Sequence, residues 1–236
     1  MHKSDIPAWA VARGKAVHDY SNIDPRRTAL IVIDLQNFFM EPGQPMANPH
    51  ALDIVTNVNR IARALRGAGG KVLFTQHSFG EADTSHEKLK GAANADSDFV
   101  RNLRQLLVPG KPGYDLHRDL DVDPNDVIIV KRRASAFHPY AQTDLKQILD
   151  EAGIDTLIVT GCVTNGCCET TARDAHGFNY RVVFVSDGNA AMTDEEHNAT
   201  LLNLRCYFAD VQTAAELSEA IDRAAAGAER RPPVEA

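Results

Sequence analysis

Short apolar runs recur five times along the chain, at residues 29–33, 72–75, 127–130, 156–160 and 181–185. Each run is almost continuous, with little alternation between apolar and polar residues, and many of its members are β-branched. This pattern is typical of strands that are buried on both faces of a parallel sheet. A shorter run at Asp210 and Val211 predicts a sixth strand.

The segments between these runs have the spacing of amphipathic helices. Residues 51–65 place apolar side chains three or four positions apart, and Gly67, Gly69 and Gly70 follow at the expected end of the helix. Further helices are predicted over residues 99–107, between Thr143 and Gly153, over 167–176, from Thr193 onward and over 214–225. Strands that alternate with helices in this way predict right-handed βαβ units. The expected fold is α/β, a single-domain three-layer αβα arrangement around a six-stranded parallel sheet.

The chain of 236 residues is compatible with one such domain. Residues 1–27 show no clean period and are predicted to form an N-terminal arm, residues 28–227 the α/β domain, and residues 228–236 a C-terminal tail. Residues 77–126 form an unusually long insertion that is predicted to be mostly loop. Insertions of this length often build a lid or a wall of a binding site.

Charge and hydropathy narrow the class of protein. The net charge is −7 and the basic residues are scattered, which argues against a nucleic-acid partner. No apolar run approaches the roughly 20 residues of a membrane-spanning helix, and the first residues lead into no signal-like apolar segment. We therefore expect a cytoplasmic protein with no membrane partner that acts on a small molecule.

Three of the four cysteines, Cys162, Cys167 and Cys168, fall within seven residues, and Cys206 lies apart from them. Cysteines this close together on one turn are poor candidates for a disulfide framework. At least one is expected to be a reactive thiol or a side chain that fills the core.

Three residues with different chemistry follow separate strands. Asp34 ends the first strand, Lys131 ends the third, and Cys167 opens the helix after the fourth. In a parallel α/β sheet these positions share one edge, where ligands bind. A helix N-terminus and a nearby cation both lower the pKa of a thiol, so we expect Cys167 to be activated as a nucleophile. Asp34 would transfer the proton and Lys131 would stabilise the developing negative charge, which completes a set for acyl transfer.

Each of these residues also has a purely structural interpretation. A cysteine near a strand is often a core residue, because cysteine is among the most buried residue types. Asp34 alone would suit a turn, and Lys131 alone would pair with any carboxylate. Their convergence on one edge of the sheet favours function.

Residues 32–39 (VIDLQNFF), 130–137 (VKRRASAF) and 160–175 (TGCVTNGCCETTARDA) resemble the isochorismatase-like cysteine hydrolases. The resemblance covers about residues 28–215 and implies that Asp34 is the proton acceptor and donor, Lys131 the electrostatic support and Cys167 the nucleophile. It also implies a cis peptide bond between Cys162 and Val163, and an oxyanion hole formed by the N–H groups of Val163 and Cys167. Relatives are commonly oligomeric, which implies a homodimer or homotetramer.

The neighbouring cysteines are expected to have other roles. A side chain one step along a helix points about 100° away, so Cys168 is predicted to pack inward when Cys167 faces the site. Cys162 would line the pocket or fill space, and Cys206 is expected in the core.

The resemblance also bears on the reaction. Nicotinamidase-type members carry an Asp-x-His metal site after the second strand, where this chain has Gln76-His77-Ser78. We therefore expect no catalytic metal and no cofactor, and nicotinamide is disfavoured as a substrate. Some relatives that act on isochorismate lack the cysteine, which argues against that vinyl-ether reaction. What remains is hydrolysis of a linear amide, carbamoyl or ureide C–N bond, as in enzymes of ureidoacrylate, biuret, triuret or N-carbamoylsarcosine.

The predicted substrate-binding residues are Phe39, Gln76, Phe137 and Asn165, each near a strand end. Two alternatives to an amidohydrolase stay open, a vinyl-ether hydrolase of the isochorismatase type and a non-catalytic binding protein on the same scaffold. A nucleotide-dependent enzyme is disfavoured, because neither a Gly-x-Gly-x-x-Gly motif nor a P-loop is present.

Overall fold

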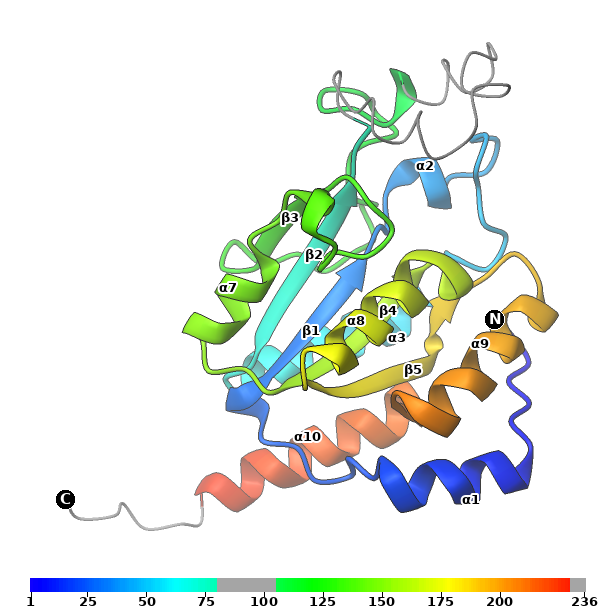
Figure 1. Cartoon of the computed structure of the whole chain (residues 1–236). Coiled ribbons are helices and arrows are strands. Elements are labelled where there is room, and N and C mark those ends of the chain that lie inside the picture. Colours follow the sequence, from blue (N-terminus) through cyan, green and yellow to red (C-terminus); the bar gives the residue numbers. More distant parts are fainter. Residues whose placement is uncertain (80–104, 230–236) are drawn as a thin grey trace.

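A six-stranded, all-parallel sheet forms the centre of the computed structural model, which describes residues 1–79 and 105–229 (Figure 1). The strands are β1 (Thr28–Ile33), β2 (Lys71–His77), β3 (Val127–Lys131), β4 (Thr156–Cys162), β5 (Arg181–Ala190) and β6 (Asp210–Gln212). Their order in the sheet is β3-β2-β1-β4-β5-β6, so the direction of winding reverses between β1 and β4. The predicted three-layer α/β fold is confirmed, and the reversal point is where such sheets bind ligands.

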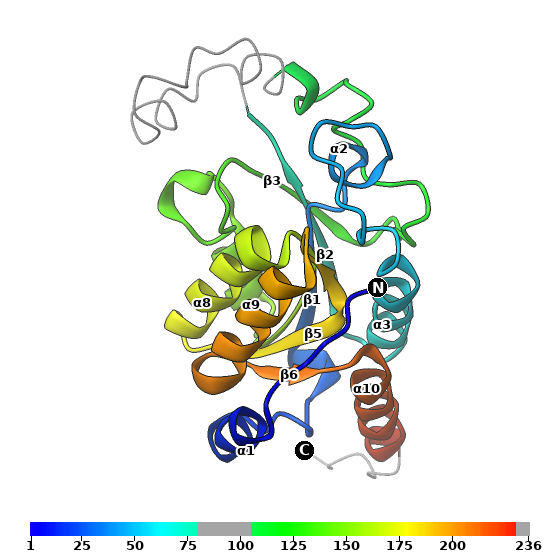
Figure 2. The same ribbon diagram turned by 90° about the vertical axis from the view of Figure 1, so that its right-hand side faces the viewer.

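Helices cover both faces of this sheet. They are α1 (Ala8–Val17), α2 (Asn37–Met40), α3 (Val55–Gly67), α7 (Leu145–Glu151), α8 (Glu169–Gly177), α9 (Asp194–Tyr207) and α10 (Ala214–Glu229), with short 3₁₀ turns at Pro25–Arg27 and Pro139–Ala141. Figure 2 shows α8 and α9 on one face of the sheet and α3 and α10 on the other. The helix α9 begins with a capping box, in which the Thr193 side chain accepts from the Glu196 N–H and the Glu196 side chain accepts from the Thr193 N–H.

The central strand β1 shows why its sequence is apolar throughout. All six of its residues are buried, and the five apolar ones alternate between two separate core clusters. Leu30 and Val32 belong to the cluster that includes α3 and α10, whereas Ala29, Ile31 and Ile33 belong to the cluster that includes α7 and α8. A strand with helices on both sides needs apolar side chains on both faces.

Gly161 of β4 pairs with Ile33 of β1, and its hydrogen takes the place of a side chain that would meet the backbone of that strand. Its φ of 127° lies in a region that favours glycine, and a Cβ atom there would collide with the Ile33 backbone. This contact fixes the relative positions of the chain segments that leave β1 and β4, at Asp34 and Cys162.

Two segments differ from the sequence-based expectation, and parts of three others lie outside the described residues. The arm contains the helix α1, which packs against α9, and β5 continues through the polar residues 186–189 to Ala190. Most of the predicted helix over 99–107, part of the predicted insertion, and residues 230–236 of the tail lie outside the described residues.

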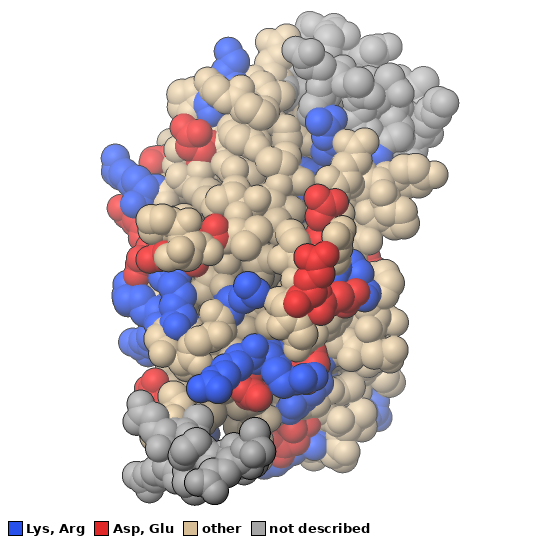
Figure 3. Space-filling view, turned by 90° about the vertical axis from the view of Figure 1, so that its left-hand side faces the viewer, with Lys and Arg blue, Asp and Glu red and all other residues tan. Residues whose placement is uncertain are grey.

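The described helices include none that is long and apolar enough to cross a bilayer. On the face shown in Figure 3, basic and acidic side chains are interspersed rather than separated into areas of one charge.

Candidate active site

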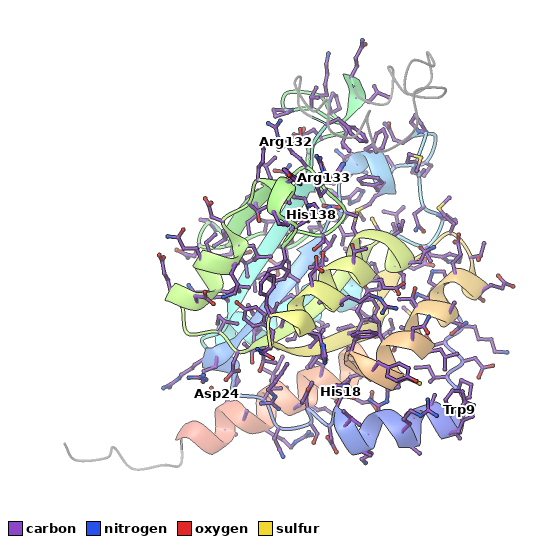
Figure 4. The ribbon with its side chains drawn as sticks, in the orientation of Figure 1. Trp9, His18, Asp24, Arg132, Arg133 and His138 are labelled. Atoms are coloured by element: carbon purple, nitrogen blue, oxygen red, sulfur yellow. The ribbon has the colours of Figure 1, made fainter. Side chains whose placement is uncertain are left out.

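A cavity of about 630 Å³ opens at the carboxyl ends of the central strands. Cys167 lies in its wall, together with residues from the segment after β1, from the end of β2 and from the loop after β3. Figure 4 labels Arg133 and His138 on that loop, at the end of the molecule opposite Trp9 and His18. The cavity therefore lies where the topology of the sheet predicts a ligand site.

Asp34 is the first residue after β1 and is completely buried. Its φ of 53° is unusual for a residue other than glycine, although aspartate tolerates this region better than most residues do. Thr75 of the neighbouring strand β2 fixes it, because the Thr75 hydroxyl donates to Asp34 Oδ1 at 2.7 Å and accepts from the Asp34 N–H at 3.2 Å. The carboxylate is therefore oriented before any substrate arrives.

Lys131, the last residue of β3, is also completely buried. Its Nζ lies 2.6 Å from Asp34 Oδ2 and donates to the Arg133 carbonyl oxygen at 2.9 Å. Burial alone would lower the pKa of Lys131, but the neighbouring Asp34 carboxylate outweighs it and raises the pKa above its ordinary value. The ammonium group therefore carries its charge throughout the neutral range.

Cys167 lies on a single π-helical turn, Thr164–Cys168, which joins β4 to α8 and is called the π-turn below. Turns of this kind are frequent at functional sites. The thiol interacts with both the Asp34 carboxylate and the Lys131 ammonium. The three residues that the sequence places at one edge thus meet in one cluster, with the sulfur in the wall of the cavity.

The expectation that the thiol has a lowered pKa is wrong. Burial and the Asp34 carboxylate raise the pKa of Cys167 to about 12, although Lys131 acts in the opposite direction. The lysine is already neutralised by its ion pair with Asp34, so its effect on the sulfur is partly cancelled. At neutral pH the resting thiol is protonated, and it needs a base at the moment of attack.

Comparison with known proteins identifies the family of this chain. The family model for the isochorismatase domain matches residues 28–216, which is most of the chain. The chain belongs to the isochorismatase family. The cis peptide bond expected for a member, between Cys162 and Val163, is present.

Among curated relatives of this isochorismatase-family chain, Nicotinamidase 3 of Arabidopsis thaliana is 33% identical over 183 residues, which is 77% of this chain and 82% of that protein. The ureidoacrylate amidohydrolase RutB of Methylobacterium radiotolerans is 30% identical over 227 residues, 88% of this chain and 85% of that protein. A cysteine hydrolase from Pseudomonas syringae is similar in structure, with a TM-score of 0.75 and 33% identity over 86% of this chain and 95% of that one.

The other three cysteines, Cys162, Cys168 and Cys206, are buried in the protein interior. Cys168 is completely buried in the core cluster beneath α8, as predicted, and Cys206 is buried as well. Cys162 is buried on the opposite face, where its thiol donates to the Asp34 carbonyl oxygen at 3.3 Å. Burial raises the pKa of Cys162 and Cys168 well above the ordinary value for a thiol. These three thiols therefore differ from Cys167, which borders the cavity.

The cavity wall includes one of the four residues predicted to bind substrate. Phe39 lines it. The Gln76 amide instead donates to the Tyr114 carbonyl oxygen at 2.9 Å, and the Phe137 ring packs against Phe178 and Tyr180. Asn165 is exposed and is not among the described residues that line the cavity. For these three residues, contact with a substrate stays a prediction.

Several wall residues were not singled out from the sequence, because their types are common in any core or loop. They are Phe38, Met46, His77, Phe79, Arg133, Ala134, Ser135, His138, Thr170, Arg173 and Asp174. His77 is held precisely by buried Gln36, whose amide group accepts from the His77 N–H at 2.7 Å and donates to the His77 carbonyl oxygen at 3.1 Å. The wall is therefore braced from behind by side chains that do not face the cavity.

At the end of β2, Gln76 and His77 do not supply the Asp-x-His pattern of a metal site. His77 Nδ1 lies 3.5 Å from the Lys131 ammonium, a cation that would repel a bound metal ion, and Gln76 contributes no carboxylate. Within the described part of the chain, one set of three possible ligands lies close together, His2, His50 and Asp194. None of these three lines the cavity.

Proposed function

We propose that the protein is a metal-independent cysteine amidohydrolase that cleaves the C–N bond of a small linear amide, carbamoyl compound or ureide through a thioester on Cys167. Its place among hydrolases of carbon–nitrogen bonds other than peptide bonds rests on its family and on the amidohydrolase and nicotinamidase relatives. The observation that supports the mechanism best is the contact of one thiol with a buried, ion-paired carboxylate at the wall of a cavity.

In the first step, Asp34 removes the proton of the Cys167 thiol while the sulfur attacks the substrate carbonyl carbon. A resting thiol with a raised pKa requires this general base, and the carboxylate beside it has the right position. The oxygen of the tetrahedral intermediate gains negative charge. The N–H groups of Val163 and Cys167 would stabilise it, with Lys131 providing positive charge next to the sulfur and the carboxylate.

In the second step, the C–N bond breaks and the proton on Asp34 passes to the leaving nitrogen, so that ammonia or an amine departs. The carbonyl carbon is now a thioester of Cys167. Asp34, again ionised, removes a proton from water, and the resulting hydroxide attacks the thioester. The acid leaves, and the sulfur recovers its proton from Asp34, which restores the starting state.

The shape of the cavity supports a small substrate with a flat, partly apolar body. Phe38, Phe39 and Phe79 contribute aromatic surface, whereas Arg133 and His138 contribute polar groups from the loop after β3. Several relatives are named as ureidoacrylate amidohydrolases, and the named substrate joins a ureide to acrylate, a short unsaturated chain that ends in a carboxylate. We therefore place ureidoacrylate-type ureides first, followed by biuret, triuret and N-carbamoyl compounds.

The test is a screen for ammonia release over small amides and ureides, with nicotinamide included, followed by mass spectrometry of the enzyme during turnover. We expect an acyl adduct on Cys167 and at least a thousandfold loss of kcat in Cys167→Ser. Cys168→Ser is the matched control, because it makes the same chemical change one residue away and should retain most of the activity. Full turnover by Cys167→Ser on the best substrate would overturn the mechanism. Hydrolysis of a vinyl ether in a separate assay, with no ammonia released from any amide or ureide, would overturn the reaction class.

A further inference from the structure

A buried histidine that the proposed mechanism does not use lies behind the π-turn. His197 on α9 has no exposed surface, and its Nδ1 lies 3.0 Å from the hydroxyl oxygen of Thr164. Thr164 is the first residue of the π-turn and is itself completely buried. The hydrogen bond therefore joins α9 to the turn three residues before the reactive sulfur.

His197 is held in place by the N-terminal segment. Its ring stacks on the ring of His2, with centroids 4.3 Å apart and an interplanar angle of 13°. His2 is fixed at both of its nitrogens, because Nδ1 lies 2.7 Å from Asp194 Oδ1 and Nε2 accepts from the Ala191 N–H at 2.9 Å. Both ring nitrogens of His2 are therefore engaged in polar contacts. The His197 ring therefore lies between the N-terminal segment, through His2, and the π-turn, through Thr164.

His197 remains uncharged over the neutral range. Burial, followed by the nearby His2, lowers the pKa of His197 to about 4. Its bond to Thr164 is then a contact between neutral groups and adds no charge near Lys131 and Asp34. A positional role fits this chemistry better than an electrostatic one.

Apart from the contacts of the Cys167 thiol with Asp34 and Lys131, the other hydrogen bonds of the π-turn among the described residues are local along the chain. The Thr170 hydroxyl donates to the Gly166 carbonyl oxygen at 2.8 Å, and the Cys168 N–H donates to the Val163 carbonyl oxygen at 3.3 Å. Such bonds shape the turn without fixing its distance from the rest of the protein. The Thr164–His197 bond spans 33 residues of sequence and supplies that constraint.

We propose that Thr164 and His197 are positioning residues whose hydrogen bond holds the π-turn so that the Cys167 thiol stays beside Asp34 and Lys131. The proposal rests on the proposed role of Cys167 as nucleophile, but not on the identity of the substrate. A displacement of about 1 Å from such a geometry costs on the order of a hundredfold in rate. Loss of the bond should therefore act on kcat far more than on KM.

The experiment compares Thr164→Val, which removes the hydroxyl but keeps the shape, with Thr164→Ser, which keeps the hydroxyl. The matched control is Thr28→Val, because Thr28 is an equally buried threonine whose hydroxyl donates to the Asp24 carbonyl oxygen at 2.7 Å, at the opposite end of the sheet. Two quantities are measured, the pH profile of iodoacetamide alkylation at Cys167 and the values of kcat and KM on the best substrate from the screen.

In Thr164→Val we expect kcat to fall by about 10- to 100-fold with KM nearly unchanged. The alkylation profile should also change, because a displaced sulfur differs in burial and moves away from both Lys131, which lowers the pKa of Cys167, and Asp34, which raises it. Thr164→Ser and Thr28→Val should keep the wild-type profile. An unchanged profile and kcat in Thr164→Val, or a serine variant that behaves like the valine variant, would overturn the proposal.

A second pair of variants covers the case in which Thr164→Val does not fold. His197→Asn can place an amide group near the position of Nδ1 and should preserve the alkylation profile, whereas His197→Leu should shift it as Thr164→Val does. Equal profiles in these two variants would contradict the proposal. Because alkylation needs no substrate, an inactive screen would count against the proposed function while leaving this test intact.

Discussion

The ammonium nitrogen of Lys131 lies 2.6 Å from the carboxylate of Asp34, and neither side chain has any exposed surface. Each charge depends on the other, because a buried ion that loses its partner has neither water nor an opposite charge to stabilise it. The pair thus couples the stability of the protein to the chemistry of its site, and the two effects separate in mutants.

We expect Lys131→Met and Asp34→Asn each to lower the free energy of unfolding by roughly 3–5 kcal/mol. The double variant should regain a large part of this stability but none of the lost activity, since the base and the cation are both gone. Urea unfolding and kcat on the best substrate measure the two effects. Arg63→Met is the control, because its pair with Asp121 is exposed at 59% and 37% and should contribute less than about 1 kcal/mol.

Alkylation of the wild-type thiol should report a protonated resting state. Because the pKa of Cys167 is raised to about 12, the thiolate fraction and the rate of alkylation should rise about tenfold per pH unit from pH 7 to 10. Peptide mapping by mass spectrometry assigns the label to Cys167. A plateau that begins near pH 7 would instead indicate a preformed thiolate, and Asp34 would then not be needed as the first base.

Acid stability should depend on His197. The pKa of His197 is about 4 in the folded protein and about 6.5 when the chain is unfolded, so the unfolded state takes up more protons between these values. The contribution of His197 to stability is therefore complete above pH 6.5 and is lost as the pH falls towards 4, with a maximum of about 3 kcal/mol.

Urea unfolding of wild type and His197→Asn at pH 7 and pH 4.5 measures this contribution. We expect the variant to lose less stability than wild type on acidification, because it has no buried imidazole to protonate. An identical loss in both proteins would show that the ring titrates normally in the folded state.

Gly161→Ala should be strongly destabilising. Its backbone conformation favours glycine, and a Cβ atom would collide with the Ile33 backbone between the two central strands. We expect a loss of more than about 2 kcal/mol, or no folded protein at all. Gly177→Ala is the control, because a Cβ atom there meets nothing within 4 Å. Thermal melting of the two variants side by side tests the difference, and equal melting temperatures would contradict it.

The sheet could be predicted from the sequence because buried parallel strands have a recognisable pattern, an uninterrupted run of apolar residues. Ala29 to Ile33 are apolar without interruption since both faces of β1 meet helices. The helix α1 has no recognisable amphipathic pattern, because its apolar residues are spread around the helix rather than gathered on one face. The end of β5 was missed because residues 186–189 are polar.

The site could be predicted only as far as strand ends determine it. Asp34, Lys131 and Cys167 come together because parallel strands end at one edge. The predicted direction of the shift in the Cys167 pKa was wrong. The shift depends on how deeply the thiol is buried and on the 2.6 Å ion pair, and the spacing of residues in the sequence indicates neither. Phe137 and Phe39 look alike in the sequence, yet one ring packs against Phe178 and the other borders the cavity.

Because β3 is an outer strand, we expect the three residues Asp34, Lys131 and Cys167 to differ in local thermal stability. Asp34 and the π-turn leave the two innermost strands, whereas Lys131 lies on an outer strand that hydrogen-bonds to β2 alone among the described strands. Outer strands open in local fluctuations that need far less free energy than global unfolding. We therefore expect the cation to be the first member of the cluster that is exposed on warming, and activity to be lost before the sheet that carries Asp34 and Cys167 melts.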